Sequence, residues 1–440
     1  MINPSNYDSS AGPGLPREKE PVKVLASGVA NPQAKYQSRN PGRPVDIPEI
    51  RSQKPRLLWI GDAVVSTGFA TVTHSILDHL RQNWDVLVSG INFFGGDHGK
   101  PYPVIPANRG KDMWGIDCFP DLCAEYQPDI VVINNDWWNV ASFVERRVPC
   151  SIVAYMPVDG ANMNPDCAGI LSRLDAAIWY TDYGFKEAQQ AGFRGNRHVI
   201  PHGVTRSDGP SASRLEARKK LNLHIPDDAF LVGNINRNQP RKRLDLSMEL
   251  FSGWIRKRRI RDAWLSLHCR RQDEGWDLEQ LARYYQIEDR VIFTEGSGAH
   301  GDVSRRRLDL IYQSLDIQIT TTSGEGWGLT TMEGMSHRIP QIVPNWAALS
   351  EWPQGVVKIP CRHQMARPGI NTIGAVPDGD AFVDELDNLY RDQTWRENLG
   401  LEGEKWVQRP QFQWENISSR LDGVLHNAVA ARHLRGGRSS

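Results

Sequence analysis

Short apolar runs alternate with longer amphipathic stretches along most of the chain. The first run spans 56–60 and ends in Gly61-Asp62, and the next stretch repeats apolar residues at helical spacing through Val72, Ile76 and Leu80. Buried strands of parallel sheets are nearly continuous apolar runs, whereas covering helices repeat every three to four residues. Further runs lie at 86–88, 130–133, 151–155, 177–180 and 198–200. This alternation predicts a parallel sheet with helices on both faces.

A polar stretch from 206 to 213 interrupts the alternation, which then restarts. New apolar runs lie at 230–233, 263–267, 291–293, 317–319, 341–343 and 356–359. The sequence therefore predicts an α/β protein with two doubly wound, Rossmann-like parallel-sheet domains that face each other across a cleft. We expect a flexible tail at 1–54, one domain at 55–205, a second at 206–410, and a C-terminal helix with a basic tail at 411–440. Ligands of open α/β sheets bind at the carboxyl ends of the strands, so we expect the functional residues there.

Composition narrows the class of protein but not its activity. The chain has 440 residues, enough for two or three domains, and its 52 basic and 52 acidic residues give no net charge. A global attraction to nucleic acid or to an acidic membrane is therefore not predicted. The six cysteines are spread along the chain, which is typical of free thiols in a reducing compartment. No run approaches the roughly 20 apolar residues of a transmembrane segment, and no signal peptide is visible, so we expect a cytoplasmic protein.

A glycine-rich turn after the run at 317–319 is the most informative segment. Its glycines allow a ligand to approach the backbone, and the helix that follows would direct its first amides at a negative group. Glu325 and Glu333 bracket the start of this helix, so both can face one pocket. Carboxylates beside an anion site are suited to accept hydrogen bonds from the hydroxyls of a sugar and a ribose. The alternative is a glycine-rich turn with solvated acids.

A basic segment follows the first apolar run of the second half. Arg237 and Lys242 could place two positive charges against a diphosphate and stabilise charge on a leaving phosphate. The alternative is a solvated basic loop.

Together the two segments resemble the GT-B glycosyltransferases, specifically the retaining family-4 type. The family's E-G-F-G-L-x-x-x-E-A-M resembles residues 325–335, with Trp327 in place of Phe and Gly334 in place of Ala. The family's basic pair resembles Arg237 and Lys242. Asn234 stands where the family's Arg follows the glycine, so Arg241 is an alternative to Arg237. The resemblance covers residues 56–405 and is most specific in the second half.

The resemblance implies a nucleotide-diphosphate sugar as donor, an acceptor hydroxyl of unknown origin, and transfer with retention of configuration. It implies no metal and no cofactor besides that co-substrate, with the leaving phosphate oxygen helping to deprotonate the acceptor. The catalytic residues it suggests are Glu325 at the donor sugar, Arg237 and Lys242 at the diphosphate, and Asp159. The donor-binding residues it suggests are Gly68, Gly326, Trp327, Gly328, Leu329 and Glu333, the last at the ribose.

The acceptor half departs from the family pattern. Where the family often has a histidine after the run at 151–155, this chain has Asp159, which is either an acceptor-side polar group or a turn residue. The aromatics of the segment 134–139 either stack on an acceptor or fill the core. We expect His202 to be a turn residue at the domain boundary.

Other functions remain open on the sequence alone. Asp378 and Asp380 have the spacing of a metal-binding D-x-D, but they precede a predicted helix and read as a cap. No His/Cys cluster has zinc spacing. The alternatives to a hexosyl-type transferase are an epimerase or hydrolase of nucleotide sugars, a phage-type transferase acting on modified DNA or protein, and a non-catalytic binding protein. Basic runs at 256–259 and 305–307 are the only local support for nucleic acid, and such runs are usually solvated helix faces.

Overall fold

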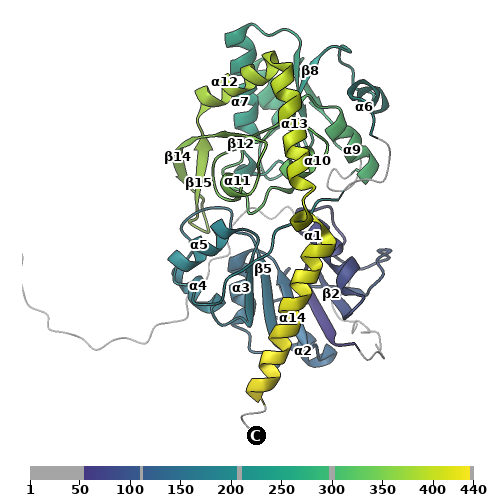
Figure 1. Ribbon diagram of the computed structural model, residues 1–440, viewed down its shortest axis with the longest axis vertical. Coiled ribbons are helices and arrows are strands. Elements are labelled where there is room, and N and C mark those ends of the chain that lie inside the picture. Colours follow the sequence, from purple (N-terminus) through teal and green to yellow (C-terminus); the bar gives the residue numbers. More distant parts are fainter. Residues whose placement is uncertain (1–53, 110–111, 206–210, 297–302, 437–440) are drawn as a thin grey trace, which may run out of the picture.

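The computed structural model describes residues 54–109, 112–205, 211–296 and 303–436. The expected N-terminal tail except its last residue, most of the polar stretch at 206–213 and the end of the C-terminal tail lie outside these residues. Two parallel sheets, one above the other in Figure 1, form the two halves of the molecule. The predicted α/β fold with two doubly wound sheets is therefore confirmed.

The first half is a seven-stranded parallel sheet in the order β3-β2-β1-β4-β5-β6-β7. Leu57 and Trp59 of its first strand face one hydrophobic core, and Leu58 and Ile60 face another, so helices cover both faces. The strands are β1 (Arg56–Asp62), β2 (Asp85–Ile91), β3 (Val104–Pro106), β4 (Ile130–Asn134), β5 (Ser151–Met156), β6 (Ala176–Trp179) and β7 (His198–Val199). The helices are α1 (Gly68–Leu80), α2 (Phe119–Tyr126), α3 (Trp137–Val144), α4 (Pro165–Leu171) and α5 (Asp182–Gln190).

The second half is a six-stranded parallel sheet in the order β10-β9-β8-β11-β12-β13, with an added antiparallel hairpin of β14 and β15. Its strands are β8 (Phe230–Asn234), β9 (Ala263–Leu267), β10 (Val291–Phe293), β11 (Ile317–Ile319), β12 (Gln341–Pro344), β13 (Val357–Ile359), β14 (Cys361–Ala366) and β15 (Ile373–Pro377). Its helices are α6 (Arg214–Lys220), α7 (Leu244–Arg258), α8 (Leu278–Tyr285), α9 (Arg305–Gln313), α10 (Leu329–Ser336), α11 (Ala348–Glu351), α12 (Gly379–Arg391) and α13 (Gln393–Val407). Short 3-10 helices η2 and η3 span Pro240–Lys242 and Pro410–Phe412.

The strand order of each sheet creates one point where the chain reverses its direction of travel across the sheet. In the first sheet this point lies between β1 and β4, and in the second it lies between β8 and β11. The loops that leave two such strands diverge to opposite faces, which opens space for a ligand at their carboxyl ends. The glycine-rich turn leaves β11 and the basic segment leaves β8, so topology alone brings the two predicted motifs together.

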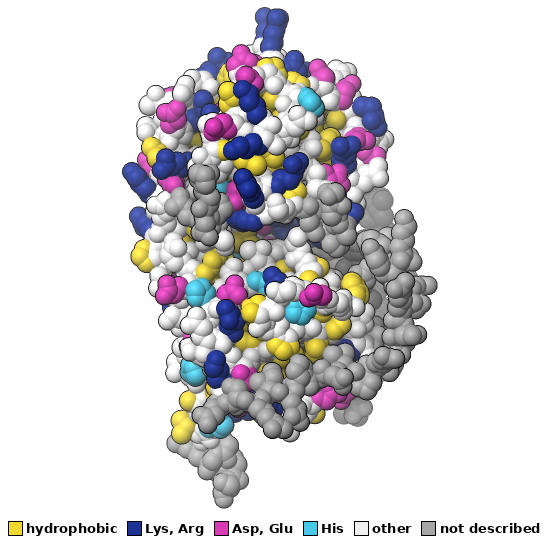
Figure 2. All heavy atoms as spheres, turned by 90° about the vertical axis from the view of Figure 1, so that its right-hand side faces the viewer, with side chains coloured by type: hydrophobic (Ala, Val, Ile, Leu, Met, Phe, Trp, Pro, Cys, Tyr) yellow, Lys and Arg dark blue, Asp and Glu magenta, His cyan; other side chains and the backbone are white. Residues whose placement is uncertain are grey.

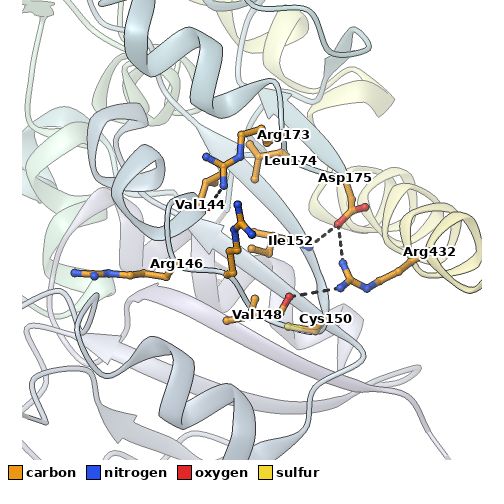
Figure 3. A pocket seen from close by; sticks show the side chains of 10 residues that line it. Val144, Arg146, Val148, Cys150, Ile152, Arg173, Leu174, Asp175 and Arg432 are labelled. Atoms are coloured by element: carbon orange, nitrogen blue, oxygen red, sulfur yellow. Dashed lines mark hydrogen bonds and ion pairs between the residues drawn. The ribbon is translucent and has the colours of Figure 1, made fainter. Parts of the chain in front are cut away.

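The C-terminal helix α14 (Trp414–Gly436) returns to the first half, where the sequence suggested a separate terminal segment. It packs along α1, and its residues Ile417, Leu421 and Leu425 are fully buried in the core of the first half (Figure 1). Near its end, Arg432 donates a hydrogen bond to the carbonyl of Val148 across a surface pocket of about 270 Å³ (Figure 3). The last helix therefore belongs structurally to the first half.

Charges of both signs are mixed over the surface. Figure 2 shows Lys and Arg side chains interspersed with Asp and Glu on the half that carries the second sheet. Among the helices that the structure describes, none combines the length and the apolar character that a membrane crossing requires.

Truncating a buried side chain of α14 should destabilise the first half. Leu421→Ala removes a side chain that is 0 % exposed, whereas Leu434→Ala removes one from the same helix that is 72 % exposed. A buried Leu→Ala change costs about 2–5 kcal/mol, and an exposed one about 0.5 kcal/mol or less. We expect urea unfolding to show a clear loss for Leu421→Ala only. Equal losses in the two variants would contradict the assignment of α14 to the core.

Candidate functional site

The glycine-rich turn lies between β11 and α10, at the reversal point of the second sheet. The chain leaves β11 through buried threonines, and Thr321 donates a hydrogen bond to the carbonyl of Arg243 at 2.6 Å. Ser323 is tied to the basic segment because its amide donates to the carbonyl of Arg241 at 2.8 Å. The turn and the basic segment therefore form one packed unit.

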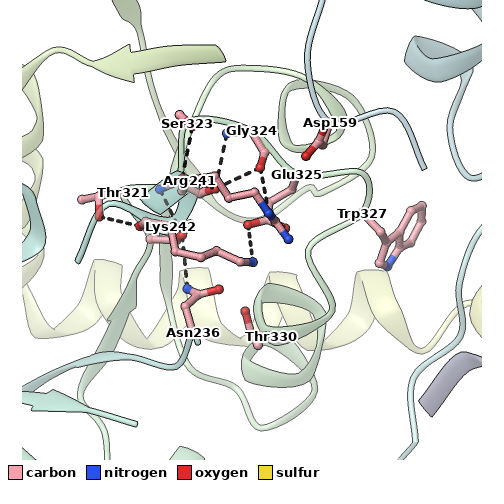
Figure 4. Close-up of polar contacts among 12 residues, drawn as sticks. Asp159, Asn236, Arg241, Lys242, Thr321, Ser323, Gly324, Glu325, Trp327 and Thr330 are labelled. Carbon is pink, nitrogen blue, oxygen red and sulfur yellow. Dashed lines mark hydrogen bonds and ion pairs between the residues drawn. The ribbon is translucent and has the colours of Figure 1, made fainter. Parts of the chain in front are cut away.

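Glu325 lies at the centre of this unit, buried between two cations (Figure 4). Its Oε1 is 2.5 Å from Lys242 Nζ, and its Oε2 is 3.2 Å from Arg241 Nη1. Burial alone would raise the pKa of this carboxyl, but the charges of Lys242 and Arg241 overcome that effect and lower it to about 2. Glu325 is therefore ionised at neutral pH.

Lys242 ends the 3-10 turn η2, which begins at Pro240 and directs the ammonium group inward. Burial, followed by repulsion from Arg241, lowers the pKa of Lys242 to about 8, while the Glu325 charge acts in the opposite direction. Lys242 is thus protonated at neutral pH but close to losing its proton.

Arg237 lies in another part of the same segment and does not contact Glu325. Its guanidinium donates to Asp273 at 2.8 Å and to Glu274 at 2.8 Å, in the loop after β9. Of the two arginines that the sequence left open, Arg241 is the one beside Lys242 and Glu325. Asn234 is fully buried and donates to Ser247 at 2.8 Å.

Glu333 lies on α10, one to two turns into the helix. Its Oε1 accepts from Arg305 Nη1 at 2.7 Å, and its Oε2 accepts from the hydroxyl of Tyr312 at 2.7 Å. Both partners come from α9, so this carboxylate is positioned from the neighbouring helix rather than by the cations at Glu325. The two predicted glutamates thus occupy separate environments on either side of the helix start.

The turn before α10 and the first residue of this helix lie in close contact with the first half. Gly328 adopts a left-handed conformation, φ 93°, and no side chain caps the helix. Leu329 packs against Gly68, the first residue of α1, where an added Cβ would lie 3.2 Å from its Cδ1. A Cβ on Gly326 would lie 2.3 Å from that of Pro157. Gly68 and Gly326 therefore lie at the interface between the halves, whereas Gly328 packs against Leu349 of its own half.

Trp327 does not face the Glu325 cluster. Its indole points away in Figure 4 and stacks on Trp352, with ring centroids 4.5 Å apart and an interplanar angle of 7°. Phe412 and His202 complete this aromatic cluster between the halves. Trp327 thus contributes an anchor for the interface, and only its backbone borders the turn.

Asp159 follows β5 and meets the second half directly. Its carboxylate accepts from Arg367 Nη1 at 2.7 Å and from Nη2 at 3.1 Å, and its carbonyl accepts from Nη2 at 2.7 Å. Both side chains are about nine-tenths buried. Sequence reasoning identified Asp159 but missed Arg367, since nothing in the local sequence connects it to this loop.

Two carboxylates of the first half were missed as site residues. Asp62 ends β1 and accepts from Thr67 Oγ1 at 2.7 Å and Asn92 Nδ2 at 3.1 Å, and burial raises its pKa. Asp136 follows β4, where burial and the nearby charge of Asp159 raise its pKa to about 7. These two strands flank the reversal point of the first sheet, which is the signal that would have identified both residues.

The aromatics of the segment 134–139 and His202 were the remaining candidates on the acceptor side, and they pack in the protein core. Trp137 is 2 % exposed within the core of the first half, and the partly buried Trp138 packs against the same cluster, so both aromatics contribute to the core. His202 is buried with Nδ1 2.8 Å from the hydroxyl of Tyr155, and burial lowers its pKa to about 3. His202 is therefore a neutral packing residue between the halves.

The D-x-D motif and the basic run at 256–259, which could have indicated other functions, form contacts within the second half. Asp378 caps α12 by accepting from the amide of Ala381 at 2.9 Å, which confirms the predicted cap. Lys257 and Arg258 of the basic run pair with Asp380 and Asp384 of the same helix. Within the described ranges, no group of three or more His, Cys, Asp or Glu side chains is placed to hold a metal ion.

No protein-family model matches the chain, and no curated protein matches it in sequence. Solved structures do match. Sucrose-phosphate synthase from Thermosynechococcus elongatus has 17% identity and a TM-score of 0.62, over 86% of this chain and 100% of that one. HepE of Anabaena, solved with UDP and glucose, has 15% identity and a TM-score of 0.65, over 85% and 100%. A glycosyltransferase from Rickettsia africae has 13% identity and a TM-score of 0.64, over 86% and 99%.

These similarities extend over both halves of the chain. At such low identity they establish architecture rather than activity. The chain has the GT-B fold of these glycosyltransferases.

Proposed function

We propose that the protein transfers a glycosyl group from a nucleotide-diphosphate sugar to an acceptor hydroxyl, with retention of configuration and without a metal ion. The observation that carries this proposal is the buried Glu325 carboxylate held by Lys242 and Arg241 immediately before α10. HepE, one of the similar structures, was solved with UDP-glucose, which supports a nucleotide sugar as the donor.

The cations account for recognition of a diphosphate. Arg241 has a planar guanidinium whose donors match phosphate oxygens, and Lys242 adds a compact charge beside it. The uncapped first turn of α10 adds backbone amides of positive partial charge. All these groups face the same turn, so they can share the charge that develops on the departing diphosphate.

The two glutamates account for recognition of hydroxyls on either side of the diphosphate. Each oxygen of Glu333 accepts one hydrogen bond, from Arg305 or Tyr312, and an ionised carboxylate has about four acceptor positions. Two positions therefore remain for the ribose hydroxyls of the nucleotide. Glu325, on the other side of the helix start, is placed for the hydroxyls of the donor sugar.

The proposed reaction occurs on one face of the sugar. The acceptor oxygen bonds to the anomeric carbon as the bond from that carbon to the phosphate oxygen breaks, and the acceptor proton passes to the leaving diphosphate. Lys242 and Arg241 stabilise this diphosphate, and the Glu325 carboxylate keeps both cations in place. Asp62 and Asp136 line the opposite side of the interface, where they are suited to accept hydrogen bonds from acceptor hydroxyls.

The acceptor hydroxyl belongs to a glycan, a protein, a small molecule or a modified nucleic acid. Pairing of the run at 256–259 with the acids of α12 lowers its value as a nucleic-acid surface. An epimerase or a hydrolase of nucleotide sugars is distinguished by its products. Consumption of donor in the absence of acceptor would favour these reactions over transfer.

A panel of nucleotide sugars should show selective stabilisation of the full chain in a thermal-shift assay. A ligand at 100 times its dissociation constant adds about 2.7 kcal/mol of stability. Glu325→Gln should reduce glycosyl transfer about tenfold or more, because the sugar contact loses its charge. Its affinity for the nucleoside diphosphate alone should fall by a smaller factor than the rate of transfer, because Lys242 and Arg241 keep their charges although the carboxylate no longer holds them in place.

The matched control is Glu279→Gln, which alters an exposed glutamate paired with Arg271 outside the site. Transfer by this variant should equal that of the wild type. Wild-type transfer in Glu325→Gln, or no stabilisation by any nucleotide sugar, would contradict the proposed function.

The pH dependence of kcat/KM should show whether the positive charge of Lys242 is needed for transfer. Because its pKa is about 8 in the free protein, kcat/KM for the donor should fall as the pH rises through that value and the positive charge is lost. Lys242→Arg keeps its charge throughout this range, so its decline should move to higher pH. Lys257→Arg, at an exposed position, is the control. Steady-state rates from pH 6 to 10 measure the three profiles, and identical profiles for wild type and Lys242→Arg would exclude this role.

A further inference from the structure

The hairpin of β14 and β15 reaches from the second half to the first. In Figure 1 it lies beside α5 at the boundary between the halves, on the side opposite the junction of α13 and α14. The turn of this hairpin spans 367–372, and the strand that follows it pairs with the loop after β5. Ala161 and Ile373 form an antiparallel bridge in which each amide donates to the other's carbonyl, at 3.0 and 2.8 Å.

A buried ion pair reinforces this backbone bridge. Arg367 makes three hydrogen bonds to Asp159, two to its carboxylate and one to its carbonyl. A Cβ on Gly160 would lie 2.3 Å from Arg367 Nη2, so the loop after β5 fits closely around the guanidinium. Buried charges are tolerated when they are paired and hydrogen-bonded, and removing one partner leaves the other uncompensated. Separation of the halves at this point would require hydration of both charges.

The hairpin is also attached to the turn that carries Glu325. The amide of Ala375 donates to the carbonyl of Ser323 at 2.9 Å, and the amide of Ser323 donates to Arg241. A Cβ on Gly324 would lie 1.8 Å from the carbonyl oxygen of Asp159, so the turn touches the loop after β5. The hairpin, the Glu325 turn and the Asp159 loop therefore form a continuous hydrogen-bonded chain across the interface.

A second contact acts on the same side of the boundary. Glu351 of α11 accepts from the amides of Asp182 and Tyr183, at 2.9 and 2.5 Å, and so caps α5 of the first half. On the opposite side, the polypeptide itself crosses between the halves, and Val204 donates its amide to the carbonyl of Phe412 at 3.1 Å. The chain therefore crosses between the halves on one side, whereas among the residues that the structure describes the hairpin and α11 join the other side through non-covalent contacts.

We propose that the β14–β15 hairpin is a clasp that holds the two halves closed, and that Arg367 is the positioning residue that holds the Glu325 turn against the acceptor side. Entry of donor and release of product require this side to open about the crossovers. The clasp does not depend on the proposed function. The positioning role of Arg367 does rest on the proposed function. Arg367 acts through Asp159 and does not touch the reacting atoms.

Hydrogen exchange of the full chain measures the clasp without any substrate. The amides of Ala161 and Ile373 are protected by each other across the interface, so their exchange rate reports opening. Arg367→Ala should increase exchange in peptides containing these amides about tenfold, and Asp159→Asn should do the same while keeping the side-chain volume. Peptides of β4 should not change, which shows that both variants remain folded.

Arg362→Ala is the matched control. Arg362 lies on the same hairpin, pairs with Asp378 within its own half, and its side chain is 71 % exposed. Exchange at Ala161 and Ile373 should be unchanged in this variant. Wild-type exchange in both Arg367→Ala and Asp159→Asn would overturn the clasp.

Kinetics test the positioning role. In Arg367→Ala, kcat for transfer should fall about tenfold while the dissociation constant of UDP changes less than about threefold, because the cations at Glu325 stay in place. Arg367→Lys, which keeps the charge but not the paired donors, should recover part of the rate. Faster exchange with an unchanged kcat would overturn the positioning role and leave the clasp. Absence of transfer by the wild type would contradict only the proposed function. The hydrogen-exchange measurements would still test whether the hairpin holds the two halves closed.

Discussion

The Glu325 carboxylate between Lys242 and Arg241 is the interaction on which the rest of the site depends. The buried charges of Glu325 and Lys242 would each be unfavourable without a partner, and the partly exposed Arg241 adds a second positive charge beside them. The carboxylate keeps two cations together that would otherwise repel each other and move to solvent. A negative diphosphate can therefore meet a positive site that already exists, and little reorganisation is needed when charge develops on the leaving group.

Close contact between the halves is the second constraint. Glycines replace side chains where the turn of one half meets the loop of the other, and Gly324 has no room for a Cβ beside Asp159. Trp327, Trp352 and Phe412 fill the interface nearer the crossovers. The aromatic cluster and the hairpin thus hold the interface at opposite sides, and the charged site lies between them.

The acidic side chains of the first half have two different roles. Asp159 is paired with Arg367, so its charge stabilises the interface rather than remaining available to a substrate. Asp62 and Asp136, with their raised pKa values, are then the acidic groups that face the cations. This division separates residues that hold the two halves together from residues that can bind an acceptor.

The sequence by itself determined the alternation of strands and helices, the two sheets, and the spacing of Glu325 and Glu333 around one helix start, because these features follow from local periodicity and turn chemistry. It missed the three-residue strand β3, which is too short to show a period. Only the tertiary structure decided that Arg241 rather than Arg237 meets Glu325, that Trp327 packs away from the turn, and that α14 joins the first half. It also brought Arg367 to Asp159, 208 positions away in the chain. Such choices depend on how loops from different strands converge, and charge and hydrophobicity at a single position carry no information about that convergence.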